Sequence, residues 1–164
     1  MKVDLTLDIL AFRKTMGLFA TGVTVLATVA DDGLTIGMTA NAITSVSLDP
    51  MLILVCVAKN AHMAPYILKT PGFSLNFLYA HQEDLSVFFA GKWKEPIPPA
   101  FEFLPWESSA PLLNGCMAAV ACRRKQVIEG GDHWIVLGEA TALYRAEDTS
   151  DPLLFYGGKY RRME

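Results

Sequence analysis

Small polar side chains gather between residues 37 and 50, and strongly apolar, β-type runs flank them on both sides. The segment reads Gly37-Met-Thr-Ala-Asn-Ala-Ile-Thr-Ser-Val-Ser-Leu-Asp-Pro50. Its hydroxyl and amide groups offer hydrogen bonds without net charge, and its glycine and alanines let backbone N–H groups approach a ligand closely. A loop of this kind suits a polar, anionic small molecule. The alternative is an ordinary Thr/Ser-rich strand with one exposed face, which composition alone favours.

His133 and the C-terminal tail are further candidates for chemistry. His133 follows a Gly130-Gly131 turn, where its imidazole either reaches a pocket or faces solvent beside a hairpin. The tail Tyr156-Gly-Gly-Lys-Tyr-Arg161 combines aromatic and basic side chains. It could cover a planar ring and pair with phosphate, or simply dock the chain end for stability.

Other kinds of catalytic site are not indicated. The chain has neither a Gly-x-Gly-x-x-Gly nor a Gly-x-x-x-x-Gly-Lys-Ser/Thr motif, so a Rossmann domain or a phosphate loop is not expected. His62, His81 and His133 are too scattered to define a metal site or a catalytic triad. Metal chemistry and hydrolysis are therefore not predicted.

Length and composition predict one domain over residues 1–164. Apolar residues make up 52% and charged residues 19%, which suggests that some apolar surface is buried between subunits. Net charge is −3, and no stretch concentrates Lys or Arg, so nucleic acid is not an expected partner.

Membrane insertion and secretion are not expected either. Charged residues interrupt each apolar run near the N-terminus that could act as a signal peptide, and the longest uncharged stretch, residues 33–48, is rich in Thr, Ser and Asn. Three cysteines without Cys-x-x-Cys spacing argue against a disulfide framework and a zinc site. We therefore expect a soluble protein of the reducing cytoplasm.

The elements that must position these residues are mostly strands. Runs of β-branched or apolar residues bounded by turn residues predict core strands at Val23–Val29, Met51–Val57, Phe73–Leu78, Ala118–Ile128 and Trp134–Tyr144. Turns at Asp31-Asp-Gly33 and Glu129-Gly-Gly-Asp132 predict two hairpins and hence an antiparallel sheet.

Short helices and one long connection complete this prediction. Apolar spacing predicts an amphipathic helix at Leu7–Phe19, capped by Thr6 or Asp8, whose stripe packs on the barrel. Further helices are predicted at His62–Leu68 and Gln82–Ala90. Residues 91–111 hold five prolines and two tryptophans, which predicts either a lid or arm to a second subunit, or a rigid surface loop.

The order of motifs along residues 12–161 resembles the flavin reductase-like family of FMN-binding split-barrel proteins. The stretches that carry the resemblance are Phe19-Ala-Thr-Gly-Val-Thr-Val-Leu-Ala-Thr28, the 37–50 segment, Gly130-Gly-Asp-His133, the tail at 156–161 and, more weakly, Phe73-Ser-Leu-Asn-Phe-Leu78. The resemblance implies a mainly β fold: a Greek-key split barrel of the FMN-binding type with a few short helices.

The same resemblance implies an NAD(P)H-dependent flavin reductase, with FMN bound, or FAD in its place, and with NADH or NADPH as reductant. It places His133 on the nicotinamide side in a positioning or proton-handling role. The cofactor-binding residues that it implies are Thr39, Ala40, Asn41, Thr44, Ser45, Val46, Ser47, Asn60, His62, Tyr160 and Arg161. Family members often carry a small hydroxyl residue in the phosphate-binding turn, where this chain departs from the pattern and has Asn60 and His62.

The implied assembly is a homodimer that hands reduced flavin to a separate monooxygenase. Two alternatives stay open. One is a non-enzymatic FMN-binding protein or electron carrier with the same fold, and the other is an enzyme that resembles pyridoxine-phosphate oxidase.

Overall fold

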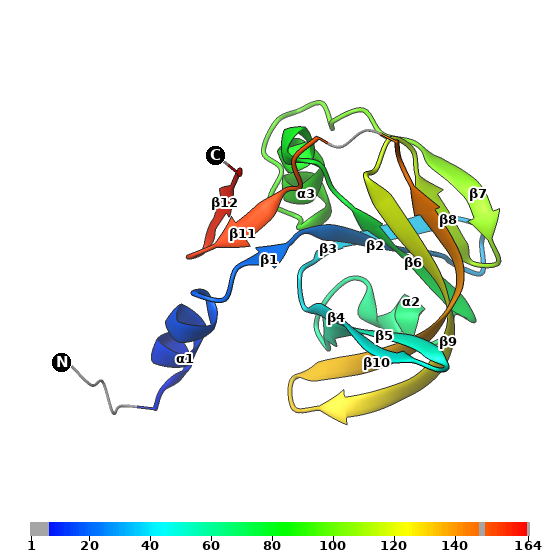
Figure 1. The fold of residues 1–164 in the computed structure, drawn as a ribbon, viewed down its shortest axis with the longest axis horizontal. Helices are drawn as coiled ribbons and strands as arrows, with labels where there is room; N and C mark the ends of the chain where they lie inside the picture. Colours follow the sequence, from blue (N-terminus) through cyan, green and yellow to red (C-terminus); the bar gives the residue numbers. More distant parts are fainter. Residues whose placement is uncertain (1–6, 148–149, 164) are drawn as a thin grey trace.

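A curled, seven-stranded antiparallel sheet dominates the computed structural model, which describes residues 7–147 and 150–163 (Figure 1). The strand order is β3-β2-β6-β9-β10-β5-β4. The strands are β2 (Thr24–Val29), β3 (Thr35–Ala40), β4 (Ile43–Leu48), β5 (Met51–Ala58), β6 (Gly72–Phe77), β9 (Ala118–Gly130) and β10 (His133–Arg145).

The two edges of this sheet, β3 and β4, follow each other in the chain without pairing with each other. Only Asn41 and Ala42 separate them, and Cys56 N–H of β5 donates to the Ala42 carbonyl at 2.9 Å. The sheet therefore curls until its edges come close, but it stays open along this seam. The predicted mainly β split barrel is confirmed.

All five predicted core strands and both hairpins are confirmed, with bounds that differ by one or two residues. Both turns use the left-handed region that favours glycine, with φ of +84° at Gly33 and +66° at Gly131. Of the two interpretations of residues 37–50, the strand is confirmed and the loop is not, because most of the segment forms β3 and β4.

Two clusters of buried side chains form the core. The first lies within the barrel around Leu26, Phe73 and Val136, and the short α2 (Ala64–Ile67) packs into it. The second lies around Val25, Leu85 and Leu113 and carries 3₁₀-helix η1 (Ala80–Gln82) and α3 (Glu83–Phe89). The helix predicted at His62–Leu68 is thus much shorter, since a turn occupies residues 61–63.

The predicted irregular connection at 91–111 contains part of a further hairpin. Strand β7 (Phe103–Glu107) pairs with β8 (Ala110–Leu113). Trp106 packs against the second core cluster, and Trp93 Nε1–H donates to the Ile97 carbonyl at 2.9 Å. These contacts fill local gaps, as the surface-loop interpretation requires.

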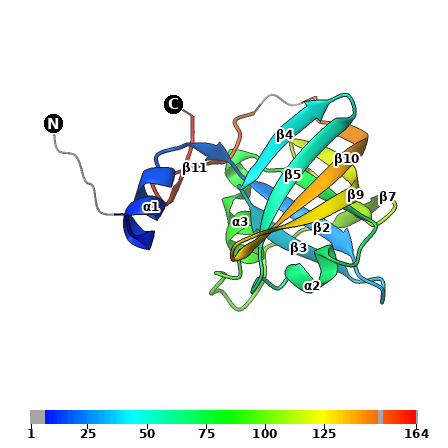
Figure 2. The same cartoon turned by 90° about the horizontal axis from the view of Figure 1, so that it is seen from below.

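The N-terminal helix α1 (Ile9–Met16) stands apart from the barrel in both views (Figures 1 and 2). Asp8 caps it, accepting from Ala11 N–H at 2.8 Å, whereas Thr6 lies outside the described residues. The prediction that its apolar stripe packs on the barrel is wrong: no residue of α1 is buried, and Phe12 is 58% exposed. A small sheet of β1 (Thr21–Gly22), β11 (Leu154–Tyr156) and β12 (Lys159–Arg161) connects α1 to the barrel.

Candidate functional site

Three adjoining pockets form a groove along the end of β3. The largest, here called the aromatic pocket, encloses about 730 Å³. Its walls come from β3, the turn before α2, the end of α3 and the segment that leads into β7. The side chains that line it include Met38, Thr39, His62, Phe88, Phe89, Phe101 and Phe103.

A smaller polar pocket of about 130 Å³ shares Thr39 and Ala90 with the aromatic pocket. It adds Asn41 from the end of β3, Tyr160 from β12 and Lys92 from the segment after α3. A terminal pocket of about 280 Å³ shares Asn41 and Val23 with the polar pocket and ends among Phe19, Phe77 and Leu153. The three pockets therefore follow one another along the barrel surface. Together they are called the β3 groove.

Hydrogen bonds through α3 fix the polar side chains of this groove. Thr39 Oγ1–H donates to the Ser86 carbonyl at 2.6 Å, and the Ser86 hydroxyl lies 2.8 Å from that of Tyr160. Asn41 Nδ2–H donates to Thr21 Oγ1 at 3.1 Å. Strands distant in sequence, β3 and β12, are thus held against the same buried serine. The groove is positioned by the core rather than by a flexible loop.

Gly37 allows the aromatic wall to lie directly on β3. A Cβ at this position would come within 2.6 Å of the Phe89 ring, closer than real Cβ contacts. Phe89 in turn stacks edge-on against Phe101 and Phe103, with ring centroids 4.9 and 5.9 Å apart. Any side chain at residue 37 must therefore displace this cluster.

Some predicted cofactor-binding residues lie in the groove and others do not. Thr39, Asn41, His62 and Tyr160 line it. Ala40 is buried, and its carbonyl accepts from Thr24 Oγ1–H at 2.7 Å. The members that line none of its three pockets, besides Ala40, are Thr44, Ser45, Val46 and Ser47 on β4, Asn60 in the turn after β5, and Arg161 on β12.

The phosphate-binding turn that the resemblance implies lies between β5 and α2. Helix α2 begins at Ala64, so Asn60 and His62 precede it, and it has only four residues. His62 instead packs edge-on against the Tyr66 ring, with centroids 5.3 Å apart. A four-residue helix provides almost no aligned dipole for an anion.

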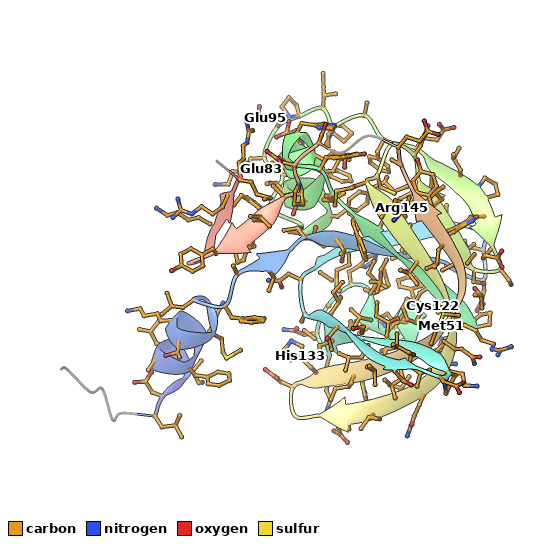
Figure 3. All side chains as sticks on the ribbon, viewed as in Figure 1. Met51, Glu83, Glu95, Cys122, His133 and Arg145 are labelled. Atoms are coloured by element: carbon orange, nitrogen blue, oxygen red, sulfur yellow. The ribbon has the colours of Figure 1, made fainter. Side chains whose placement is uncertain are left out.

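His133 lies outside the β3 groove, on the first position of β10 (Figure 3). Its Nδ1 is 2.7 Å from Asp132 Oδ1, and Lys59 N–H anchors the Asp132 carbonyl at 2.9 Å. The hydrogen bond from His133 is the main reason that the pKa of Asp132 is lowered. His133 faces a separate cleft of about 870 Å³, which Phe12 and Arg13 of α1 line from the other side.

Lys59 and Glu129 lie beside the turn of the same hairpin. They form an ion pair, and the Lys59 ammonium lies 4.9 Å from the centre of the Trp134 ring. The hydrogen bond from Lys59 lowers the pKa of the Glu129 carboxyl.

Sequence reasoning missed two groups of groove residues. Phe101 and Phe103 belong to a proline-rich segment that folds back against α3. No local sequence pattern reveals this path. Lys92 follows the helix predicted at Gln82–Ala90, but nothing in the sequence relates it to Thr39 or Asn41. The only sequence signal for Lys92 was its position shortly after a predicted helix that carries two adjacent phenylalanines.

Within residues 7–147 and 150–163, no group of three or more His, Cys, Asp or Glu side chains is arranged to hold a metal ion. Burial raises the pKa of the Cys116 and Cys122 thiols to about 12, and it also raises that of Cys56. These thiols are therefore protonated and unreactive. No helix in the described part of the chain has the length and apolar character needed to span a membrane.

Comparisons with known proteins agree on one family. The family model described as "Flavin reductase like domain" matches residues 16–164. The chain is 39% identical over 159 residues to the NADH-dependent FAD reductase of Streptomyces globisporus, covering 94% of this chain and 86% of that protein. It is 33% identical over 156 residues to HsaB of Rhodococcus jostii, the reductase subunit of a flavin-dependent monooxygenase, covering 93% and 77%. Among solved structures, flavin reductase PheA2 superposes with a TM-score of 0.89 at 37% identity, covering 96% of this chain and 99% of that one.

Proposed function

The chain belongs to the flavin reductase-like family, and from that premise we propose that its β3 groove binds the flavin to which it transfers hydride from a reduced nicotinamide cofactor. The observation that carries this assignment is the groove itself. Uncharged hydrogen-bonding groups of Thr39, Asn41 and Tyr160 adjoin an aromatic pocket of about 730 Å³. Ligand pockets of small molecules typically combine these features at this size.

The residues present fit a flavin. An isoalloxazine ring is planar and apolar on its faces and carries polar atoms along one edge. Phe88, Phe89 and Phe101 provide apolar walls, while Thr39 and Asn41 provide polar atoms at the adjoining rim. We propose FMN as the flavin, with FAD as the alternative.

A bound flavin supplies the two-electron acceptor for the hydride. The chain contributes orientation and exclusion of water. Because Thr39 and Tyr160 are already fixed through Ser86, binding orders few further side chains. His133 is proposed to act on the nicotinamide side, where its ring is oriented by Asp132. NADH is the proposed reductant, since the relatives at 39% identity are named as NADH-dependent enzymes.

A homodimer is part of this proposal, with the second copy covering α1. Ile9, Phe12 and Phe19 are 80%, 58% and 72% exposed. Burying one such side chain contributes about 1.5–3 kcal/mol of free energy, so contact of a second copy with this face would favour association. The double substitution Ile9→Glu with Phe12→Glu is expected to convert a dimer into a folded monomer in light scattering. A wild-type monomer at the concentrations used for assay would contradict the proposal.

We also propose that reduced flavin passes to a separate monooxygenase, as the name of the relative HsaB indicates for that protein. A reducing, cytoplasmic location is proposed because Cys56, Cys116 and Cys122 are all free thiols.

Steady-state oxidation of NADH tests the function. Protein mixed with NADH and catalytic FMN in air should oxidise NADH continuously, at a rate that depends on added flavin. FMN that binds without any turnover would instead support a carrier.

A further inference from the structure

The C-terminal hairpin contributes to the β3 groove although it lies outside the barrel sheet. Strand β12 pairs with β11, and β11 pairs with β1. In the described part of the chain, none of these three strands pairs with the seven-stranded sheet. Next to α1, Gly157 N–H in the turn of the hairpin donates to the Gly17 carbonyl at 2.8 Å (Figure 1). From this turn β12 returns to α3 and brings Tyr160 into the polar pocket.

Ser86 of α3 joins this hairpin to the groove. It is fully buried, and both its hydroxyl and its carbonyl are used. The hydroxyl lies 2.8 Å from that of Tyr160, while the carbonyl accepts from Thr39 Oγ1–H at 2.6 Å and from Ala90 N–H of its own helix at 3.0 Å. Ser86 lines none of the three pockets, so it acts on a ligand in the groove only through the side chains that it bonds.

Resting on the proposed function, we propose that Ser86 is a positioning residue that orients the Tyr160 hydroxyl toward the flavin and thereby couples β12 to flavin binding. The Tyr160 ring packs edge-on against Phe155, with centroids 5.5 Å apart, which holds the plane of the ring. The Phe155 contact leaves the O–H bond free to rotate, whereas a hydrogen bond to a buried serine fixes its direction.

The hydroxyl pair leaves Tyr160 with one further hydrogen bond to offer. Within the pair one hydroxyl donates and the other accepts, so the Tyr160 oxygen keeps either its own O–H or a lone pair for a ligand. The polar edge of an isoalloxazine ring carries both N–H and C=O groups, so it can meet either arrangement. Without Ser86, the half-buried Tyr160 hydroxyl would turn to water, and flavin binding would have to order it again.

The competing role of Ser86 is purely structural, since the same bond also holds the chain end. Two measurements separate the roles in wild type, Ser86→Ala, Tyr160→Phe and the double variant. The first is the dissociation constant of FMN, from quenching of its fluorescence. The second is amide hydrogen exchange of residues 154–161, followed by mass spectrometry with and without FMN.

We expect each single variant to weaken FMN binding by about 5- to 20-fold. The double variant should bind within about twofold of the weaker single variant, because the two hydroxyls act as one unit. FMN should slow exchange of residues 154–161 in wild type and leave it unchanged in both single variants. Tyr160→Phe keeps the ring and its contact with Phe155, so it decides the question even where Ser86→Ala fails to fold.

Tyr144→Phe is the matched control. Tyr144 is also half-buried and packs against the second core cluster, but it lines none of the three pockets. Its removal of a hydroxyl should leave FMN affinity and the exchange of residues 154–161 as in wild type.

Unchanged FMN affinity in Tyr160→Phe would overturn the proposal, and so would fully additive losses in the double variant. Exchange that becomes faster by the same factor with and without FMN would also overturn it, because Ser86 would then only hold the chain end. Wild type that binds FMN and gives any of these results contradicts the Ser86 assignment alone, whereas wild type that binds no flavin contradicts the proposed function and this coupling together.

Discussion

Ser86 of α3 holds two side chains of the β3 groove: its carbonyl accepts from Thr39 Oγ1–H at 2.6 Å, and its hydroxyl lies 2.8 Å from that of Tyr160. The His133 ring, by contrast, is held by one bond to Asp132, whose side chain is 94% exposed. The polar side chains of the β3 groove are therefore bonded to a buried residue of the core, whereas the His133 side chain is bonded only to a residue at the surface. The difference suggests a division of tasks. A preorganised groove suits a flavin that must be held in one orientation, while a solvent-facing hairpin suits a nicotinamide that enters and leaves at each turnover.

Disrupting the core beneath the groove should give the largest effect. Asn76 is fully buried; its amide donates to the Val25 carbonyl at 3.1 Å, and its oxygen accepts from Leu113 N–H at 2.9 Å. We expect Asn76→Ala to lower the free energy of unfolding by about 2–4 kcal/mol, measured by urea denaturation, because it leaves buried backbone groups unpaired. Asn114→Ala, at an exposed position bonded to Glu102, should cost less than about 0.5 kcal/mol. Equal losses would show that Asn76 is not a structural anchor.

Removing a polar group of the groove itself should affect the ligand rather than the fold. Asn41→Ala is expected to weaken FMN binding by about 1–3 kcal/mol, measured by fluorescence quenching. Unfolding should change little, because Asn41 is exposed and its bond to Thr21 is at the surface. Asn114→Ala, at an exposed position that lines none of the three pockets, is the control outside the groove. Normal FMN affinity in Asn41→Ala would mean that the flavin lies elsewhere.

Changing the His133 hairpin should affect the use of NADH without affecting the binding of FMN. His133→Ala is expected to raise KM for NADH by about tenfold, the effect of one lost hydrogen bond to a polar ligand, with the dissociation constant of FMN unchanged. Stopped-flow reduction of bound flavin measures the step directly. Unchanged reduction kinetics would remove His133 from the mechanism, and a matching loss of FMN affinity would place it in the flavin site instead.

Local signals explain which parts of the fold were predictable from sequence. The core strands are β-rich runs, and Gly33 and Gly131 mark turns where φ is positive, so both hairpins could be located without any distant contact. The apolar stripe of α1 was equally visible, but periodicity shows only that a face is apolar. It cannot show whether the barrel or a second subunit covers that face, and the barrel does not.

The candidate site was predictable in part, since Thr39, Asn41, His62 and Tyr160 were all expected to bind the cofactor and all line the groove. Thr39 and Asn41 were found because they are close together in a polar segment. Phe101 and Lys92 reach the same groove through the path of the 91–111 segment and the end of α3, which depend on tertiary packing. Polar residues of β4 looked equivalent to those of β3, because sequence cannot tell which of two neighbouring edge strands faces a pocket.

The smallest expected effect concerns the ion pair between Glu129 and Lys59 beside the turn of the His133 hairpin. Because the pKa of Glu129 is lowered in the folded protein, its charged form adds stability above its ordinary value of 4.5, and this contribution disappears as pH falls through the lowered value. Glu129 is fully exposed, so salt should screen most of the effect.

Thermal unfolding of wild type and Glu129→Gln between neutral and acid pH measures this contribution. The difference in Tm should be small and positive for wild type at neutral pH and low salt; it should begin to shrink near the ordinary pKa of 4.5 and reach zero only below the lowered pKa of the folded protein. Glu107→Gln, at an exposed position without an ion pair to any described residue, should show no such trend. A difference that grows as pH falls would mean that the Glu129 carboxylate destabilises the hairpin. Because an exposed ion pair contributes little to folding, this pair bears on how firmly the His133 turn is held and not on whether the barrel forms.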